Sequence, residues 1–323
     1  MKIQYLRRLF SFILIIFLYL SSTGCSQDEK QPLRIASSPW PGFEPLYLAR
    51  DLGYLDKNKT KLFELPSLDI TMESFRNRSA DLATLTLDEV LELLLYGTKL
   101  RILLIMDISN GGDAVLAKPE IKNIEEIKGK RISIVNVPLG LYMLNRMLDK
   151  AGLKRQDVKV FPMPDTQQEK FYQAGNADVV VTYDPVKSRL QKAGLNVIFD
   201  SSDIPNEIFD LLVVHEDVYQ SRKKELCELG SNWFKTLEYI KNNKDATRRM
   251  GQRLAVSTEE FDKMMQGLKV PTKDEHKNLL IGENPLLIVA AKKFSRILMH
   301  EKHFAENVDA SVAIDKDFLA CLK

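Results

Sequence analysis

Cysteine, histidine and tryptophan are scarce in this chain of 323 residues, which contains three, four and two of them respectively. So few cysteines exclude a small fold held together by disulfides. The composition, 45% apolar and 28% charged, excludes intrinsic disorder and a collagen-like fibre. The apolar run 9–20 covers twelve residues, fewer than the roughly 20 that a membrane-spanning helix needs. A polytopic membrane protein is therefore excluded as well.

Acidic residues are absent from the first 24 positions, where Lys2, Arg7 and Arg8 are the only charged side chains. The rest of the chain carries 43 basic and 44 acidic residues, a net charge near −1. Proteins that bind nucleic acid usually show a basic surface. The charge balance therefore gives no reason to expect a nucleic-acid partner.

Sequence motifs of catalysis are also lacking. The chain has no G-x-S-x-G, no P-loop, no G-x-G-x-x-G and no pair of cysteines at metal-binding spacing. His300 and His303 are spaced to share one face of a helix, but no cysteine lies near them, and two solvated histidines are the expected outcome. We predict no catalytic residue, no metal and no cofactor, and hence no enzyme.

The N-terminus has the pattern of a secretory signal. A basic start is followed by the apolar run 9–20 and by the small residues of SSTGC, which ends at Cys25. A cysteine at this point resembles the lipobox of bacterial lipoproteins, although Ser22 stands where that motif prefers leucine. We expect residues 1–24 to be a signal peptide and Cys25 to carry the lipid (palmitate). The alternative is an uncleaved signal anchor.

A polar segment and two further cysteines complete this part of the analysis. Residues 26–32, SQDEKQP, contain no apolar side chain, so residues 25–32 are predicted to be a tether. Cys227 and Cys321 would be permitted to pair in an oxidising compartment. Sequence gives no distance between them, so a disulfide and two buried thiols both remain open.

From Leu33 onward, short apolar or β-branched runs alternate with helical patterns, which predicts an α/β fold with a largely parallel sheet. Strands are expected at 33–36, 68–71, 80–84, 100–106, 114–117, 131–135, 158–161, 178–182, 197–199 and 211–214. Helices are expected at 43–52, 90–96, 139–151 and 285–299. Capping boxes begin at Thr86, Thr166 and Ser257. The two α/β blocks predict two lobes, and the chain after Tyr219 is predicted to be almost wholly helical.

The connections that follow the strands are rich in small and hydroxyl residues, and each stands just before a helix N-terminus. Ligands of open α/β sheets bind at the carboxyl ends of the strands. The candidate ligand-binding residues from these connections and their neighbours are Ser38, Trp40, Phe43, Thr86, Asp88, Asp113, Asn136, Tyr183 and Asp184. The alternatives left open are helix capping for Asp88 and Asp184 and a core position for Trp40.

These residues carry a resemblance to a known family. Residues 35–56, IASSPWPGFEPLYLARDLGYLD, resemble the first strand and helix of ABC-importer solute-binding proteins of the nitrate/sulfonate/taurine and thiamine-precursor (NMT1/THI5-like, SsuA-like) group. Residues 107–119, 127–131 and 177–185 resemble its interlobe crossing, the opening of its second lobe and its "DAvvtweP" stretch. The likeness covers residues 33–305. The cysteine-rich motif of the family's enzyme branch has no counterpart in this chain.

The resemblance implies a two-lobe, type II periplasmic-binding fold with two hinge crossovers. The first lobe is expected to comprise 33–115 and 215–323, with the C-terminal helices packed on it, and the second lobe 116–214. It also implies a monomer that captures a small solute in an interlobe cleft and serves ABC permease and ATPase subunits. Its expected location is extracytoplasmic, anchored by lipid to a bacterial membrane, on the periplasmic side if there are two membranes.

Two other functions remain open at this stage: a sensor that presents a solute to a membrane receptor without transport, and an enzyme that uses the cleft. Neighbouring permease and ATPase genes would favour transport. The four strand-end connections contain no Lys or Arg, whereas Glu44, Asp88, Asp113 and Asp184 lie in or near them. Buried carboxylates oppose an anion. The sequence therefore favours a neutral or amine-bearing solute, stacked on Trp40 or Tyr183, with Asp113 and Asp184 on either side of it.

Overall fold

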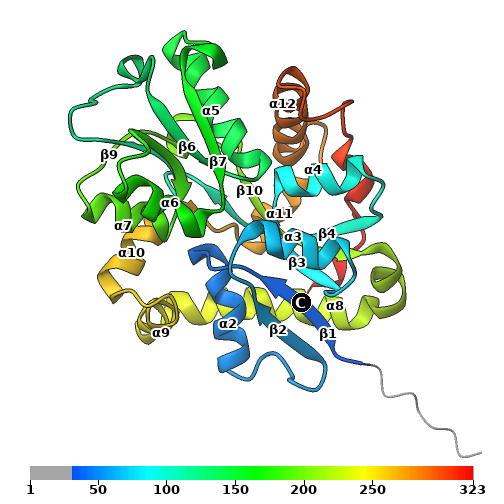
Figure 1. Ribbon diagram of the computed structural model, residues 1–323. Helices are drawn as coiled ribbons and strands as arrows, with labels where there is room; N and C mark the ends of the chain where they lie inside the picture. The colour runs from blue at the N-terminus through cyan, green and yellow to red at the C-terminus, as the bar shows by residue number, and fades with distance from the viewer. Residues whose placement is uncertain (1–30, 323) are drawn as a thin grey trace, which may run out of the picture. The chain divides into compact units, whose positions relative to one another are not determined.

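Two β-sheets organise the chain in the computed structural model (Figure 1), which describes residues 31–322. Residues from Leu33 onward form one compact unit. The predicted signal peptide and Cys25 lie outside the described residues. No helix among the residues described is long and apolar enough to cross a membrane.

The first sheet has six strands in the order β11-β4-β10-β3-β1-β2. Their bounds are β1 Leu33–Ser37, β2 Thr60–Glu64, β3 Leu82–Thr86, β4 Leu100–Ser109, β10 Phe209–His215 and β11 Leu268–Lys269. Strands β1, β2 and β3 are parallel, whereas β10 runs antiparallel to both β3 and β4. The residues of β3 and β10 are all buried. These apolar central strands anchor the first lobe.

Helices from both ends of the chain complete the first lobe, some in contact with the sheet and others packed on those helices. They are α2 Glu44–Asp51, α3 Leu68–Arg76, α4 Leu87–Leu95, α8 Glu216–Asn242, α9 Asp245–Arg253, α10 Thr258–Gln266, α11 Lys273–Leu280 and α12 Leu286–His300. Short 3-10 turns include η1 Pro41–Phe43 and η4 Ser201–Asp203. The expected helical C-terminal segment on the first lobe is thus present.

The second sheet has five strands in the order β7-β6-β8-β5-β9 and forms the second lobe with three helices. The bounds are β5 Asp113–Ala117, β6 Arg131–Val135, β7 Lys159–Met163, β8 Val179–Tyr183, β9 Asn196–Asp200, α5 Pro138–Ala151, α6 Asp165–Gln173 and α7 Val186–Lys192. Side chains alternate along β5: Val115 joins the core on the α5 side, while Leu116 packs with Leu190 of α7. Helices therefore cover both faces of this sheet.

The chain crosses from one sheet to the other at two segments that lie earlier in the sequence than predicted. β5 pairs only with β8 and β9, and β10 pairs only with β3 and β4. Residues 113–115 therefore belong to the second lobe, and residues 209–214, which were expected there, belong to the first. The crossings are the segments 110–112 and 201–208. The predicted limits failed because an apolar strand carries no sign of which sheet it will join.

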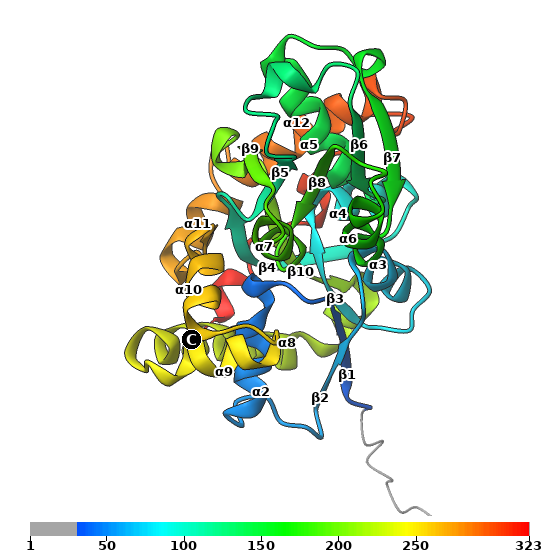
Figure 2. The same ribbon diagram turned by 60° about the vertical axis from the view of Figure 1, so that its left-hand side comes forward.

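Helix α12 contacts both lobes, beside α4 of the first and α5 of the second (Figures 1 and 2). Phe294 of α12 stacks on Tyr142 of α5 with ring centroids 3.5 Å apart. Cys227 on α8 forms a disulfide with Cys321 near the C-terminus, across a sequence separation of 94. A closed loop of that length removes about 4–5 kcal/mol of chain entropy from the unfolded state. The disulfide left open by the sequence is therefore present, and it secures the C-terminal segment.

Both sheets are mixed rather than largely parallel, because β5, β10 and β11 pair antiparallel with their neighbours. Two local predictions were also wrong. The expected strand 68–71 is the start of helix α3, whose buried residues Leu68, Thr71 and Phe75 share one helical face. The expected capping box at Thr166 is absent, because α6 already begins at Asp165 and its N-cap is Pro164. The capping boxes at Thr86 and Ser257 are both confirmed. A short apolar run cannot by itself distinguish a strand from a buried helix segment.

Candidate functional site: a pocket between the lobes

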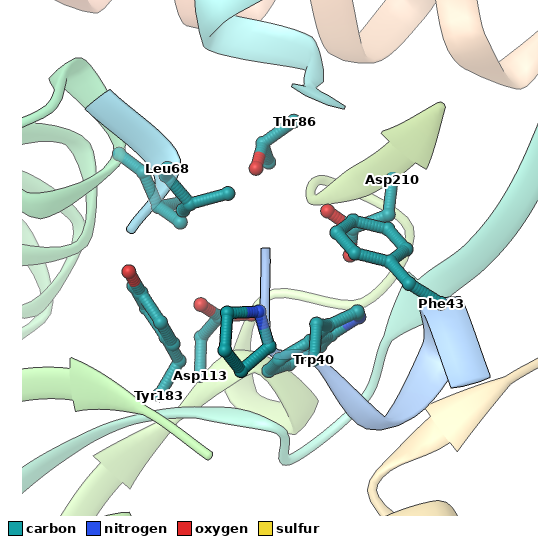
Figure 3. Close-up of a pocket in the computed structure, with 9 residues that line it drawn as sticks. Trp40, Phe43, Leu68, Thr86, Asp113, Tyr183 and Asp210 are labelled. Atoms are coloured by element: carbon teal, nitrogen blue, oxygen red, sulfur yellow. The ribbon is translucent and has the colours of Figure 1, made fainter. Parts of the chain in front are cut away.

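A small cavity of about 10 Å³ lies where the two lobes meet (Figure 3). Its wall combines aromatic, aliphatic and acidic side chains: Pro39, Trp40, Phe43, Leu68, Thr86, Asp113, Leu139, Tyr183 and Asp210. The first lobe supplies the connection after β1, the start of α3 and the ends of β3 and β10. The second lobe supplies the start of β5, the first turn of α5 and the end of β8. A solute here would touch both lobes.

The indole of Trp40 is fixed in place by a carboxylate of the neighbouring strand. Trp40 Nε1 donates a hydrogen bond to Asp107 Oδ2 of β4 over 3.0 Å. A Cβ atom at Gly42 would lie 1.8 Å from that same oxygen. Only glycine at position 42 lets this bond form, which gives the PWPG segment a physical explanation. On its other side Trp40 meets Tyr183 edge to face, with centroids 6.0 Å apart.

The first crossing packs directly against this indole. A Cβ atom at Gly112 would lie 2.8 Å from Trp40 Cη2. The backbone N–H groups of Asn110 and Gly112 both donate to the carbonyl of Gly267, and Gly111 donates to Ser201 Oγ of the second crossing. The crossings and the pocket wall are therefore one continuous packed unit.

Two carboxyl groups face each other across adjacent strands of the first sheet. Asp210 of β10 stands directly opposite Asp107 of β4 and, on the other side, opposite Thr86 of β3. Asp107 is 0% exposed and Asp210 is 4% exposed. Burial raises the pKa of Asp107 to about 7. Burial, together with the charge of Asp107, raises the pKa of Asp210 well above its usual range. Such a pair shares one proton rather than ionising twice.

A third buried carboxyl enters the pocket from the second lobe. Asp113 opens β5 opposite Tyr183 of β8 and is 3% exposed. Burial raises the pKa of Asp113 to about 6, against the opposing effects of a Ser109 hydrogen bond and the charge of Lys187. Lys187 itself donates to the carbonyl of Gly111 over 2.7 Å and to Asp184 Oδ2 over 3.2 Å. The nearest base is therefore already held by other groups.

Helix N-termini around the pocket are occupied by carboxylates of the protein. Asp88 Oδ2 of the first lobe accepts the N–H of Leu139 in the first turn of α5 over 2.7 Å. Glu89 accepts the N–H of Thr86 at the start of α4. Asp184 accepts the N–H of Ser188 at the start of α7. Free N–H groups at helix N-termini are the usual backbone site for anions. An internal acid takes one N–H at the start of each of these three helices, whereas the start of α3, where Leu68 lines the pocket, has no side-chain cap.

Five of the nine residues predicted from the sequence line this pocket: Trp40, Phe43, Thr86, Asp113 and Tyr183. The other four lie elsewhere. Ser38 is buried with no hydrogen-bond partner for its Oγ atom, and Asp88 and Asp184 have the capping role that was left open. Asn136 lines a second cavity between α3, α5 and β7, beside Glu92 and His303. His303 lies beyond the end of α12, so it does not share a helix with His300.

Sequence analysis missed Leu68, Leu139 and Asp210, and did not single out Pro39. Leu68 was placed in a strand, and Leu139 was noted only as a helix start. Asp210 did carry a signal, because it is a lone acid within the apolar strand FDLLVVH. Asp107 is likewise a lone acid within the apolar strand LRILLIMDIS. A charged residue inside a buried strand is rarely tolerated without a partner or a function.

Comparison with solved structures defines the class of fold. The alkanesulfonate-binding protein SsuA from Xanthomonas axonopodis pv. citri, bound to MOPS, superposes with a TM-score of 0.73 at 15% identity, over 89% of this chain and 99% of that one. The periplasmic aliphatic sulphonate binding protein SsuA from Escherichia coli gives 0.73 at 15% identity, over 89% and 92%. The desulfurization enzyme DSZB gives 0.66 at 17% identity, over 89% and 98%. The chain therefore has the two-lobe type II periplasmic-binding fold.

Sequence comparison identifies the family. The NMT1/THI5-like family model matches residues 40–247, from Trp40 of the pocket through the whole second lobe. The chain belongs to the NMT1/THI5-like family. No curated protein sequence shows detectable similarity to it.

Proposed function

We propose that this protein is a lipid-anchored, extracytoplasmic solute-binding protein that captures a small organic solute between its lobes for an ABC importer. The observation that carries the proposal is the pocket itself, since its wall is built from both lobes. A solute held there would bind the closed arrangement more tightly than the open one and would shift the protein toward closure. That change of shape is what permease and ATPase subunits would recognise.

Three further observations support this function. The SsuA proteins of the same fold are described as alkanesulfonate and sulphonate binding proteins. The disulfide between Cys227 and Cys321 suits an oxidising compartment outside the cytoplasm. The lipobox-like segment that ends at Cys25 would hold a monomeric protein at the membrane, close to its transporter.

Binding rather than catalysis is the proposed role, although one protein of this fold is an enzyme. A hydroxyl, thiol or amine nucleophile is activated by a base within hydrogen-bond reach. Thr86 is the one such side chain in the described pocket wall, and the base opposite it is the buried carboxyl of Asp210, which is paired with Asp107. The acids of the wall are therefore assigned to ligand recognition.

The test is to isolate the protein from its native membranes, denature it and identify the released small molecule by mass spectrometry. Uptake of that molecule, labelled with an isotope, is then measured in cells with and without the gene. Loss of uptake without the gene is the expected result. Unchanged uptake, combined with a changed response of a membrane receptor, would replace transport with the sensor function.

A further inference from the structure

The charge of the pocket decides which solutes it can accept. Three acids, Asp107, Asp113 and Asp210, lie in or directly behind its wall, and no Lys or Arg lines it. No ion pair joins any of these three acids to a base within the part of the chain that the structure describes. A buried carboxylate without a partner is costly. The acids of the wall therefore offer acceptors that suit a positive charge or hydrogen-bond donors.

Among the described residues, no basic side chain lines the pocket wall to hold an anion. The N-termini of α4, α5 and α7 accept carboxylates of the protein, namely Glu89, Asp88 and Asp184. The nearest base, Lys187, is engaged by Asp184 and by the carbonyl of Gly111. A sulfonate would have to displace these groups and would also face the charge of Asp113. The similarity of fold to sulfonate-binding proteins therefore does not by itself imply that this pocket takes a sulfonate.

The two acids that line the pocket come from different lobes. Asp210 belongs to the first lobe and Asp113 to the second, and Figure 3 shows both carboxyl groups beside the space between the lobes. A ligand with donors on two sides would join the lobes, because each lobe contributes one acceptor.

Aromatic rings supply the remaining surface. Trp40, Phe43 and Tyr183 line the same space (Figure 3), and the face of an aromatic ring attracts a cation. This surface favours a flat ligand that carries a positive charge.

We propose that the solute is a small organic cation of the amine or amidine class, which donates N–H groups to Asp113 and Asp210 from between the rings of Trp40, Phe43 and Tyr183. This inference rests on the proposed function, since it names the class of solute captured by the same pocket. It replaces the expected pair Asp113 and Asp184 with Asp113 and Asp210, because Asp184 caps α7.

The test uses three probes of nearly equal size: benzamidine, a cation; benzamide, which is neutral; and benzenesulfonate, an anion. Binding to the purified full chain is measured by calorimetry and by thermal shift at pH 8. Benzamidine is expected to bind most tightly, benzamide more weakly, and benzenesulfonate not at all. Asp113→Asn and Asp210→Asn should each weaken benzamidine binding by about tenfold or more, as expected for a lost charged hydrogen bond.

The matched control is Asp262→Asn, which removes an exposed carboxylate on α10 far along the chain from the pocket residues. It should leave the affinity for benzamidine unchanged. Circular dichroism of each variant establishes that it is folded before its affinity is compared.

Three results would contradict the proposal. They are binding of benzenesulfonate as tight as that of benzamidine, wild-type affinity in both Asn variants, and no binding of benzamidine at millimolar concentration. The identity of the small molecule released from native protein distinguishes failure of the cation proposal from failure of the proposed function. An anion in that fraction would overturn the cation class and leave solute capture intact. Absence of any released molecule, together with no binding of the three probes, would contradict both.

Discussion

Individual buried carboxyl groups determine the charge of this pocket. An aspartate in water has a pKa of about 3.9, whereas burial raises the pKa of Asp113 to about 6 and that of Asp107 to about 7. The groups around Asp113 are Ser109, Lys187 and Asp184, and those around Asp107 are Trp40, Asp210 and Asp113. The pocket therefore becomes more negative as the pH rises through the range 5–8.

The first prediction concerns stability without a solute. A carboxyl group whose pKa is raised in the folded state binds more protons there than in the unfolded chain. It therefore lowers the free energy of unfolding as the pH rises. For Asp113 this loss of unfolding free energy occurs between about pH 4 and pH 7. Asp113→Asn should therefore gain stability relative to wild type across this window, by up to about 2–3 kcal/mol at pH 8.

Urea denaturation of both proteins at pH 5, 6, 7 and 8 measures this difference. The comparison between variant and wild type is needed because other acids, such as Glu207 beside Arg146, have lowered pKa values and contribute the opposite slope. Asp262→Asn is again the control, with no expected change. A difference between Asp113→Asn and wild type that is constant over the series would show that Asp113 is not strained by its burial.

At the scale of elements, the most consequential contact joins α4 of one lobe to α5 of the other. The N-cap of α5 is Val137, which offers no side-chain hydrogen bond. Asp88, fully buried at the start of α4, supplies that cap across the lobe boundary through the N–H of Leu139. Opening of the pocket at this point would leave both groups without a partner. The contact thus favours the closed arrangement.

The second prediction follows from this contact. Asp88→Ala leaves a helix N–H without its acceptor and should lower the free energy of unfolding by about 1–2 kcal/mol. The measurement is made near pH 4, close to the pKa of an aspartate in the unfolded chain, so that the destabilising effect of the raised pKa of Asp88, about 7 in the folded state, is still small. Affinity for the bound solute should also fall, because closure is less favourable.

Asp88→Asn is the matched variant, since its amide oxygen can still accept the Leu139 N–H. It should retain most of the stability and affinity that Asp88→Ala loses. Equal losses in the two variants would assign the effect to the carboxyl charge rather than to the cap across the lobes.

At the scale of the whole molecule, the placement of the protein depends on its N-terminal segment. Cys25 precedes the polar residues 26–32, and the folded unit begins at Leu33. We predict that Cys25→Ser abolishes labelling by a radioactive fatty acid and releases the protein from membranes or leaves it unprocessed. The folded unit should keep its solute affinity, because none of the pocket residues lies before Pro39.

Fractionation of cells that express each form, followed by labelling and calorimetry, tests this. Labelled Cys25→Ser protein would place the anchor elsewhere in the chain. Loss of affinity in a correctly folded Cys25→Ser protein would show that the anchor does more than hold the protein at the membrane.

The sequence by itself determined the class of this protein. Alternating apolar runs and helical patterns defined an α/β fold with two lobes, and local hydrogen-bond chemistry located the capping boxes at Thr86 and Ser257. The connection that carries Trp40 and Phe43 was identified as a pocket wall because a strand end and a helix start are both visible in sequence. These features depend on residues that lie within a few positions of one another.

Tertiary structure alone decided which acids face the pocket and which cap a helix. Asp88 and Asp184 are occupied by N–H groups of α5 and α7, whereas Asp210 reaches the pocket only because β10 is inserted between β3 and β4. The pairing of Cys227 with Cys321 spans 94 residues and was equally invisible. Such contacts join distant parts of the chain, and their geometry exists only after the sheets have formed. The chemistry of the pocket therefore depends on the fold, because only the fold brings these distant residues together.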